Sequence, residues 1–484
     1  MPKTRRNAAG FFEKKNMLKK NEEYRIRIED YGNDGEGIGH VDGIAVFVKD
    51  VVKGDLAKVR IVKAKKNYAY GIPLEIISPS PDRVTPPCPH ARVCGGCSLM
   101  HISYDSQLAW KQQKVRACLE RIGGVENAAD LMEPIVRLRG DAGEGDGLRY
   151  RNKGQFPVGK GRDGELLMGF YGRHSHRIVN TEGCLLQSAK MDLVLHRCRE
   201  FLEESSLEPY DEENHSGLIR HIVIREARAT GELQVCPVIC ADSLPGDADE
   251  RLVDVLKDID GITSIVLNIN KERTNRILGA RTRLLWGREW IEDRIKDLSF
   301  EIGPVSFYQV NPVQTERMYE KILSYAHLTG SETVFDLYCG IGTISLFLAR
   351  SAKYVYGIEI VPEAIEDAKR NAVRNGITNV RFQAGKAEKL LPFIYENEGV
   401  KADVIVVDPP RKGCDEAAID TMIRMSPARI VYMSCDPATL ARDIARLKKG
   451  GYEPQKVCVF DNFCQSTHVE TIALLARIKD TMRV

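Results

Sequence analysis

Two side chains suited to covalent chemistry on a substrate stand at the ends of predicted strands. Cys435 follows the apolar run Ile430–Met433, and Glu470 comes directly before the run Thr471–Leu475. A thiolate adds to an electron-poor carbon and a carboxylate accepts a proton, so the two supply a nucleophile and a general base. A lone cysteine is more often a packing residue, and a lone glutamate is often a surface ion-pair partner. Position at a strand end, where ligands bind, favours the catalytic interpretation.

A glycine-containing turn farther upstream has the features of a nucleoside-binding site. The segment Phe335–Thr343 leaves one predicted strand and opens a helix, and its glycines let the backbone approach a ligand closely. Glu359 ends the next strand, where a carboxylate can accept hydrogen bonds from both ribose hydroxyls. Leu346 stands in the region of the third glycine of dinucleotide-binding turns. The pattern therefore favours S-adenosylmethionine over NAD.

Other residues mark the same edge of the predicted sheet. Asp408-Pro-Pro-Arg411 follows a fourth strand, and its two prolines stiffen the chain where a substrate would meet the cofactor. Cys339, inside the glycine turn, competes with Cys435 for the role of nucleophile, although packing against the cofactor is the simpler interpretation. Three further cysteines are interpreted as core or surface thiols: Cys414, Cys458 and Cys464.

A compact group of cysteines predicts a metal site. The spacing is Cys88-x5-Cys94-x2-Cys97. A four-coordinate site needs one more ligand, for which Cys184 is the best candidate and Cys118, on a predicted helix, the weaker one. Four thiolates suit either zinc or an iron–sulfur cluster, and the spacing alone does not decide between them.

The elements that must position these residues fall into several regions, so we expect a multidomain α/β protein. Residues 300–484 alternate strand and helix, which predicts a doubly wound, Rossmann-like parallel sheet. Residues 81–299 are expected to form a central α+β domain with the cysteine cluster. Residues 17–80 have the short strands and glycine turns of an OB-like β-barrel, and residues 1–16 are a basic tail. The strands expected in the last domain are Thr333–Leu337, Tyr354–Ile358, Val380–Gln383, Val404–Val407, Ile430–Met433 and Thr471–Leu475.

Composition narrows the class of protein. An apolar fraction of 43% with 29% charged residues is ordinary for globular proteins. No apolar run approaches the ~20 residues of a membrane span, and no apolar signal region follows the basic start. We expect a cytoplasmic monomer with no membrane association, in which the 13 cysteines stay reduced. Because the net charge is only +2, a polyanionic partner must be bound by a local basic patch.

One such patch lies in the predicted barrel. It contains no acidic residue, and two tyrosines that could stack on bases follow it. The alternative interpretation is a solvated lysine face with tyrosines in the core. The patch comprises Lys58, Arg60, Lys63, Lys65 and Lys66, followed by Tyr68 and Tyr70.

Taken together, the motifs resemble the RNA uracil-5-methyltransferase family, and within it the iron–sulfur branch that acts on 23S ribosomal RNA. The resemblance extends over nearly the whole chain, and the barrel resembles a TRAM domain, an RNA-binding module. The most specific motifs are Phe307–Pro312, Asp336–Gly342, Asp408–Gly413, Ser434–Pro437 and His468–Thr471.

The resemblance implies a role for each motif. It makes Cys435 the nucleophile and Glu470 the base, with RNA and not DNA as the partner. Thr343 departs from the pattern, because some relatives carry an amide residue there, and its contact is left open. S-adenosylmethionine would be bound by Gln309, Tyr338, Glu359 and Asp408. A [4Fe–4S] cluster, now favoured over zinc, would be held by Cys88, Cys94, Cys97 and Cys184.

Three other functions fit parts of this pattern. A transfer RNA uracil-5-methyltransferase would share the catalytic motifs. An adenine or cytosine N-methyltransferase would use Asp408-Pro-Pro-Arg411 to hold an amino group and would not need Cys435. A non-catalytic RNA-binding protein gated by the redox state of its metal cluster would not need the residues at the sheet edge. In a uracil methyltransferase, Arg411 is a candidate for stabilising negative charge on uracil O4.

Overall fold

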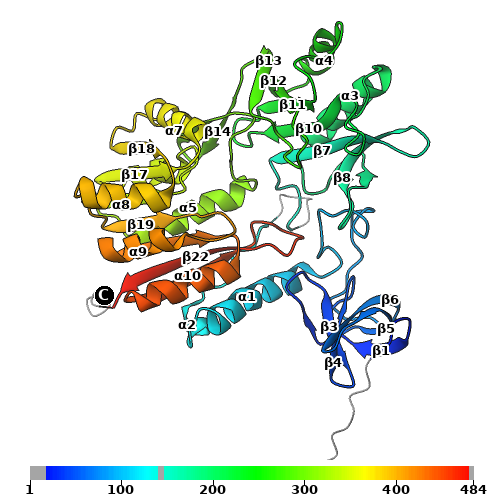
Figure 1. Cartoon of the computed structure of the whole chain (residues 1–484), viewed down its shortest axis with the longest axis horizontal. Helices are drawn as coiled ribbons and strands as arrows, with labels where there is room; N and C mark the ends of the chain where they lie inside the picture. The colour runs from blue at the N-terminus through cyan, green and yellow to red at the C-terminus, as the bar shows by residue number, and fades with distance from the viewer. Residues whose placement is uncertain (1–17, 140–145, 479–484) are drawn as a thin grey trace, which may run out of the picture. The chain divides into compact units, whose positions relative to one another are not determined.

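The computed structural model describes residues 18–139 and 146–478 and divides into two compact units (Figure 1). The first unit comprises Met1–Pro87 with Ser98–Ser106, and the second comprises Cys88–Cys97 with Gln107–Val484. The expected basic tail, residues 1–16, lies outside the described residues. No helix in the described ranges has the length and apolar character needed to cross a membrane.

The first unit is built on a six-stranded sheet with the order β1-β5-β6-β4-β3-β2. Its neighbours are antiparallel, except that β4 and β6 are parallel. Alternate residues such as Val46, Val48 and Val59 are fully buried, as the two-residue period of a strand requires. At Gly39 a Cβ atom would come within 2.3 Å of the Arg27 carbonyl oxygen, so only glycine fits. The strands are β1 (Glu23–Arg27), β2 (Asp30–Tyr31), β3 (Gly37–Val41), β4 (Ile44–Val48), β5 (Leu56–Ala64) and β6 (Tyr68–Ser78).

The second unit contains two seven-stranded sheets, the first with the order β13-β12-β11-β10-β7-β8-β9. Apolar residues of α3 and α4 pack on this sheet in one core, for example Leu195 and Leu252 against Ile224 and Val235. The strands are β7 (Lys153–Lys160), β8 (Leu166–Tyr171), β9 (Ile178–Asn180), β10 (Ile219–Glu226), β11 (Leu233–Ile239), β12 (Ile262–Ile269) and β13 (Arg281–Gly287). The helices are α3 (Ala189–Glu204) and α4 (Ala248–Leu256).

The other sheet of this unit has the order β18-β17-β16-β19-β20-β22-β21. Its strands are β16 (Thr333–Leu337), β17 (Tyr354–Glu359), β18 (Val380–Ala384), β19 (Val404–Val407), β20 (Arg429–Ser434), β21 (Tyr452–Phe460) and β22 (Glu470–Arg477). Its helices are α5 (Pro312–Ala326), α6 (Thr343–Ala349), α7 (Pro362–Arg374), α8 (Ala387–Asn397), α9 (Glu416–Met425) and α10 (Pro437–Lys449). Also packed in the two cores around it are α1 (Tyr104–Arg121), α2 (Ala128–Leu131) and the hairpin β14 (Ile291–Ile295) and β15 (Leu298–Ile302).

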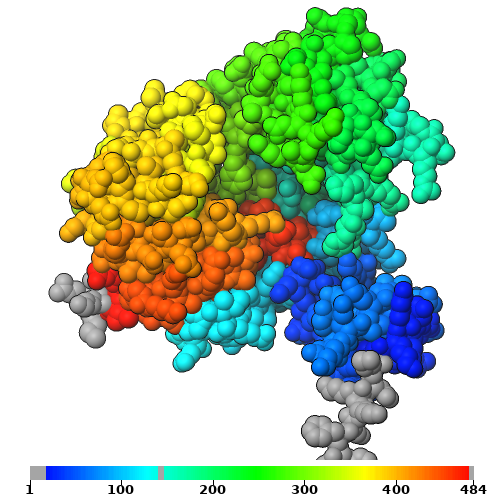
Figure 2. Space-filling view, viewed as in Figure 1, coloured from blue at the N-terminus to red at the C-terminus, as the bar shows by residue number. Residues whose placement is uncertain are grey.

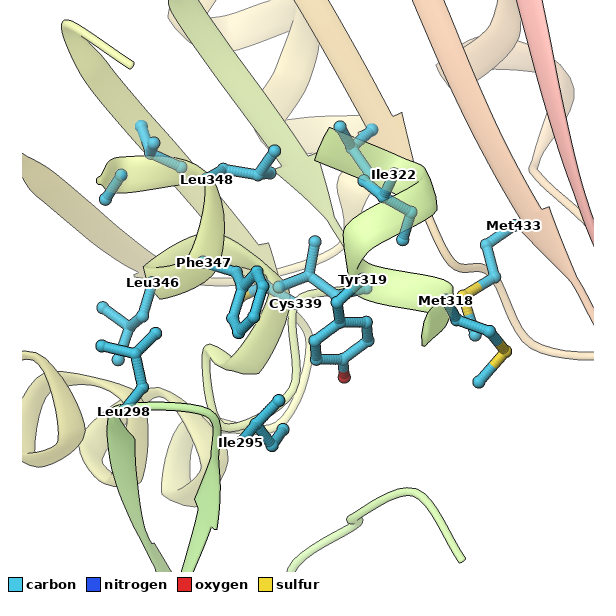
Figure 3. Packing of buried hydrophobic residues seen from close by; sticks show 14 of the residues in the cluster. Ile295, Leu298, Met318, Tyr319, Ile322, Cys339, Leu346, Phe347, Leu348 and Met433 are labelled. Carbon is cyan, nitrogen blue, oxygen red and sulfur yellow. The ribbon is translucent and has the colours of Figure 1, made fainter. Parts of the chain in front are cut away.

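Successive residues of these strands alternate between two apolar cores. Val334 of β16 packs in a core with α5, α6 and α7, whereas Phe335 packs in a core with α1, α8, α9 and α10. Figure 3 shows the first core, where the rings of Tyr319 and Phe347 meet edge to face at 5.6 Å. A sheet covered by helices on both faces leaves its carboxyl edge as the place for a ligand.

The last two strands correct the expectation of an entirely parallel sheet. β22 runs antiparallel to both β20 and β21, while β16 to β20 are parallel to one another. β21 was also missing from the expected strands. Pro454 interrupts its sequence pattern and the register shifts between Pro454 and Lys456, which is tolerated because β21 lies at the sheet edge.

Candidate active site

The carboxyl edge of the carboxyl-terminal sheet brings the candidate nucleophile and base together. Ser434, the last residue of β20, pairs with Thr471 of β22 in antiparallel register. Cys435 follows Ser434 and Glu470 precedes Thr471, so this register makes Cys435 and Glu470 neighbours. Asp408 follows β19, which pairs with β20 on its other side.

Glu470 is a buried acid, and few hydrogen bonds or positive charges stabilise its ionised form. It is 4% exposed, and its Oε2 has no hydrogen-bond partner in the part of the chain that the structure describes. Burial raises the pKa of its carboxyl well above the usual range; the charge of Asp408 raises it further and that of Arg411 lowers it. Removal from solvent also raises the pKa of the Asp408 carboxyl to about 7. A cation bound beside these carboxyls would favour their ionised forms.

The half-buried Cys435 faces the same charges. Burial raises the pKa of its thiol to about 11; Glu470 and Asp408 contribute to the rise, and Arg411 opposes it. Arg411 is exposed and acts on both the nucleophile and the base. Arg411 thus lies near three groups that become negative when they lose a proton: the Cys435 thiol and the carboxyls of Glu470 and Asp408. Three such groups against one arginine suit a positively charged ligand.

The glycine turn after β16 is held in the conformation that its residues allow. Tyr338, Gly340 and Gly342 have φ values of 67°, 54° and 84°, in the left-handed region. Glu359 Oε2 accepts a hydrogen bond from the Gly340 N–H at 3.2 Å, and its Oε1 accepts one from the Val361 N–H at 3.0 Å. The carboxylate expected to bind ribose is thus fixed beside the turn.

Asp336 is a residue of this site that the sequence interpretation did not assign. It is fully buried in β16, and its Oδ2 accepts a hydrogen bond from the Ser345 hydroxyl at 2.5 Å. Its Oδ1 has no partner among the described residues. Burial, together with the charges of Asp408 and Glu359, raises its pKa to about 7. An aspartate inside an apolar strand was the signal that could have identified it.

Helix α5 connects the expected cofactor residue Gln309 with the glycine turn. Gln309 is buried three residues before α5, and its carbonyl accepts a hydrogen bond from Asn152 Nδ2 at 2.9 Å. From α5, the hydroxyl of Tyr319 lies 2.8 Å from that of Thr343. The Thr343 side chain is therefore hydrogen-bonded to Tyr319.

The other cysteines of this sheet and its loops differ from Cys435 in exposure. Cys339 is 6% exposed and lies in the apolar core drawn in Figure 3, where burial raises the pKa of its thiol well above the usual range. Cys414, Cys458 and Cys464 are buried too. Cys435 is thus the more accessible of the two candidate nucleophiles.

The four cysteines expected to bind metal gather within the second unit. Burial raises the pKa of the Cys97 thiol, and the nearby thiols of Cys184, Cys94 and Cys88 raise it further, so all four lie within electrostatic range. Cys94 Sγ accepts a hydrogen bond from the Gly96 N–H at 3.4 Å. Within the described ranges, no three or more His, Cys, Asp or Glu side chains are arranged to hold a metal ion.

In the first unit, the expected basic patch is partly neutralised. Glu23 of β1 lies 2.8 Å from both Lys58 and Arg60, because β1 pairs with β5. Tyr68 and Tyr70 are 39% and 38% exposed and form a ring cluster with Phe47. The alternative interpretation of the two tyrosines as core residues is therefore wrong.

Comparisons with known proteins agree with this architecture. The family model described as tRNA (Uracil-5-)-methyltransferase matches residues 271–478, and the TRAM domain model matches residues 18–74. An uncharacterised RNA methyltransferase of Halalkalibacterium halodurans is 49% identical over 95% of this chain and 98% of its own. One of Caldanaerobacter subterraneus is 47% identical over 96% of this chain and 100% of its own.

One solved structure matches nearly the whole chain. It is the Pyrococcus abyssi tRNA (uracil-54, C5)-methyltransferase in complex with S-adenosyl-L-homocysteine, with a TM-score of 0.73 and 26% identity. The match covers 93% of this chain and 99% of that one. The chain therefore belongs to the uracil-5-methyltransferase family of RNA methyltransferases and carries a TRAM domain.

Proposed function

We propose that the protein transfers a methyl group from S-adenosylmethionine to C5 of a uridine in RNA, through a covalent bond between Cys435 and C6. The observation that carries this proposal is the pairing of Ser434 with Thr471, which sets Cys435 beside Glu470 at the edge of the sheet where the glycine turn begins. The similar Pyrococcus structure holds S-adenosyl-L-homocysteine, the product of such a donor, which supports the choice of cofactor.

The chemistry needs both residues because uracil C5 is a poor nucleophile. The Cys435 thiolate adds to C6, and the electron pair of the C5–C6 bond becomes available at C5, with negative charge shared by O4. C5 then takes the methyl group from the sulfonium, whose sulfur keeps the bonding pair. Glu470 removes the C5 proton, and the C–S bond breaks to restore the double bond and free the thiolate.

The charges of the site fit a sulfonium donor. Asp408 and Glu470 repel each other when ionised, and a positive sulfonium would lower the pKa of both. An ionised Glu470 is the form that can accept the C5 proton. Arg411 faces Cys435 and Glu470 and can stabilise the charge that develops on O4.

We assign 23S ribosomal RNA as the substrate, on the resemblance to the iron–sulfur branch. Transfer RNA is the second candidate, because the matching family model and the similar solved structure both carry that substrate in their descriptions. The test is incubation of the purified protein and S-adenosylmethionine with unmodified 23S RNA and transfer RNA, followed by mass mapping of 5-methyluridine. Methylation of 23S RNA is expected, methylation of transfer RNA alone would select the second candidate, and none in either would contradict the proposal.

We also propose that Cys88, Cys94, Cys97 and Cys184 hold a [4Fe–4S] cluster. The thiols of Cys88, Cys94 and Cys184 all lie near that of Cys97, which supports it, and each thiolate can supply one ligand. The chain around Cys97 is braced, since Arg173 donates hydrogen bonds to the carbonyls of Ala91 at 2.8 Å and Cys97 at 3.1 Å. When bound, the cluster would crosslink residues 88–97 to the segment at Cys184.

Protein purified without oxygen is expected to be brown and to contain about four iron and four sulfide per chain. Cys184→Ser should lose the iron, because only three thiolates remain. Cys118→Ser is the matched control and should keep it, since that thiol lies on α1 beside Lys114. Metal analysis and absorption spectra read the result, and zinc without iron in the wild-type protein would contradict the cluster.

Replacing Lys63, Lys65 and Lys66 by alanine is expected to weaken RNA binding and to flatten its salt dependence by up to about 2–3 units of log K per log salt. These three lysines are exposed and form no ion pair with another described residue. The replacement of Lys58 and Arg60 should flatten it less, because Glu23 already neutralises part of their charge.

Titrations of RNA binding at several salt concentrations measure the effect. Tyr68→Ala/Tyr70→Ala is the complementary variant: it should weaken binding by about 1–3 kcal/mol per stacked base and leave the salt dependence unchanged. A triple-lysine variant with the wild-type salt dependence would show that this face does not contact phosphates.

A further inference from the structure

The chain that leads into the proposed base is an irregular and largely buried loop. We call residues 461–469, between β21 and β22, the base loop; it has no helix or strand. Phe460 before it pairs with Glu470 after it, so the loop closes directly on the base. Asp461, Asn462 and Cys464 are fully buried. The buried carbonyl groups of a loop that belongs to no strand ladder must find other hydrogen-bond partners.

Cys464 and Ser466 donate hydrogen bonds to carbonyls within the loop, but most of the partners come from outside it. Five of its carbonyls accept a hydrogen bond from a side chain that belongs to a segment distant in sequence. The donors lie on α1, just before β7, and at the start of α5. The pairs, donor first, are Lys111 and Phe463 (3.0 Å), Lys114 and Thr467 (3.2 Å), Tyr150 and Cys464 (3.2 Å), Asn311 and Asn462 (3.0 Å), and Gln314 and Asp461 (3.3 Å).

Helix α1 contributes an ion pair to the contacts that hold the base loop. Lys111 and Asp461 form an ion pair, and both side chains are fully excluded from solvent. One turn away, Gln107 Nε2 donates to Gln465 Oε1 at 3.0 Å, and Gln465 has a φ of 64°, which is uncommon for a residue other than glycine. Gln107, Lys111 and Lys114 follow the spacing that puts side chains on one helix face. In Figure 1 the red chain before β22 reaches the cyan helix α1, and Figure 2 shows red atoms of the carboxyl-terminal segment between the orange and cyan parts of the second unit.

We propose that Lys111 is a positioning residue for the methyl-transfer reaction: it holds the base loop so that Glu470 faces C5 of the methylated adduct. This inference rests on the proposed function. It follows from two features of Glu470. This residue is the first of β22, directly after the base loop, and its Oε2 has no hydrogen-bond partner among the described residues. The orientation of the Glu470 side chain must therefore be set by the packing of the base loop and not by a hydrogen bond to Oε2. Removing one partner of a buried ion pair leaves the other charge uncompensated, so Lys111 and Asp461 favour the conformation in which they meet.

The experiment follows one turnover on methylatable RNA and separates formation of the Cys435 adduct from release of methylated RNA. Lys111→Met is expected to leave adduct formation unchanged and to slow release about 100-fold, because a shift of about 1 Å at a reacting group can have that effect. Methylated RNA bound to protein should accumulate on denaturing gels. A lesion that only loosens the fold would reduce adduct formation and release together.

Two further variants keep the test decisive. Lys111→Met/Asp461→Leu removes both charges, so no unpaired charge is buried if the single variant fails to fold; it should show the same slow release. Gln112→Leu is the matched control, because Gln112 lies on the same helix but bonds to the backbone of Glu133 and Ile135. It should release RNA at the wild-type rate.

The outcomes distinguish this inference from the function on which it rests. If wild-type protein forms no Cys435 adduct, the proposed function fails; if it does but Glu470→Gln traps no methylated adduct, the base is another group and Lys111 has no base to position. If Glu470→Gln traps it while the folded double variant releases RNA at the wild-type rate, the role of Lys111 is overturned and the function stands. A parallel loss of adduct formation and release in the double variant would also overturn it, as a purely structural role.

Discussion

RNA methylation is expected to disappear when Cys435 is replaced by alanine, while S-adenosylmethionine should bind with wild-type affinity. Without addition at C6, uracil C5 has too little nucleophilic character to attack the sulfonium methyl. The thiol acts on the base and not on the cofactor, and of the expected cofactor residues Tyr338 follows β16 and Glu359 ends β17, whereas Cys435 follows β20. Incorporation of labelled methyl groups and calorimetric titration of the cofactor measure the two effects.

Cys339→Ala is the matched control for this prediction. That thiol is buried in an apolar core, so its loss should leave the covalent step intact. RNA with 5-fluorouridine at the target should trap wild-type protein and Cys339→Ala, because fluorine cannot leave as a cation, and should not trap Cys435→Ala. A trapped complex in Cys435→Ala would assign the nucleophile to another cysteine. No trapped complex with wild-type protein, on an RNA sequence that it methylates, would contradict the covalent mechanism.

The sequence predicts the strands around this site where the local pattern of apolar residues determines their bounds. β16 and β19 have the bounds that their apolar runs predicted, because a strand buried on both faces is a continuous apolar segment. The direction of β22 was not readable, since an apolar run looks the same whether a strand is parallel or antiparallel. β21 was hidden by Pro454, Gln455 and Lys456, which interrupt its apolar pattern at the sheet edge.

Local pattern also placed the candidate site residues at strand ends, but not their partners. Tyr338, Glu359, Asp408 and Cys435 could be expected near one another because parallel strands present their carboxyl ends at one edge. Lys111 had no such signal: it lies 350 residues from Asp461 in the sequence, and one more lysine on an amphipathic helix looks like a solvated residue. Glu23 was missed as the partner of Lys58 and Arg60 for the same reason, since strand pairing brings it there.

Glu470→Gln is expected to have an effect opposite in kind to that of Cys435→Ala. Glutamine has the shape of glutamate and no charge, and burial already raises the pKa of Glu470 well above its usual range, so the fold should tolerate the change. Addition by Cys435 and methyl transfer do not need the carboxylate. Removal of the C5 proton does, so the variant should stop as a methylated RNA joined to Cys435.

After a single turnover, denaturing electrophoresis and mass analysis of Glu470→Gln should show a complex of protein and RNA that carries one methyl group. The double variant Cys435→Ala/Glu470→Gln should form no such complex. The pH dependence gives an independent reading. Because the carboxyl accepts a proton only when ionised, wild-type release should slow as the pH falls, and the slow residual release of Glu470→Gln should lose that dependence. Release at the wild-type rate by Glu470→Gln would assign the base to another group, with Asp408, whose pKa is raised to about 7 by its removal from solvent, as the nearest acid to test.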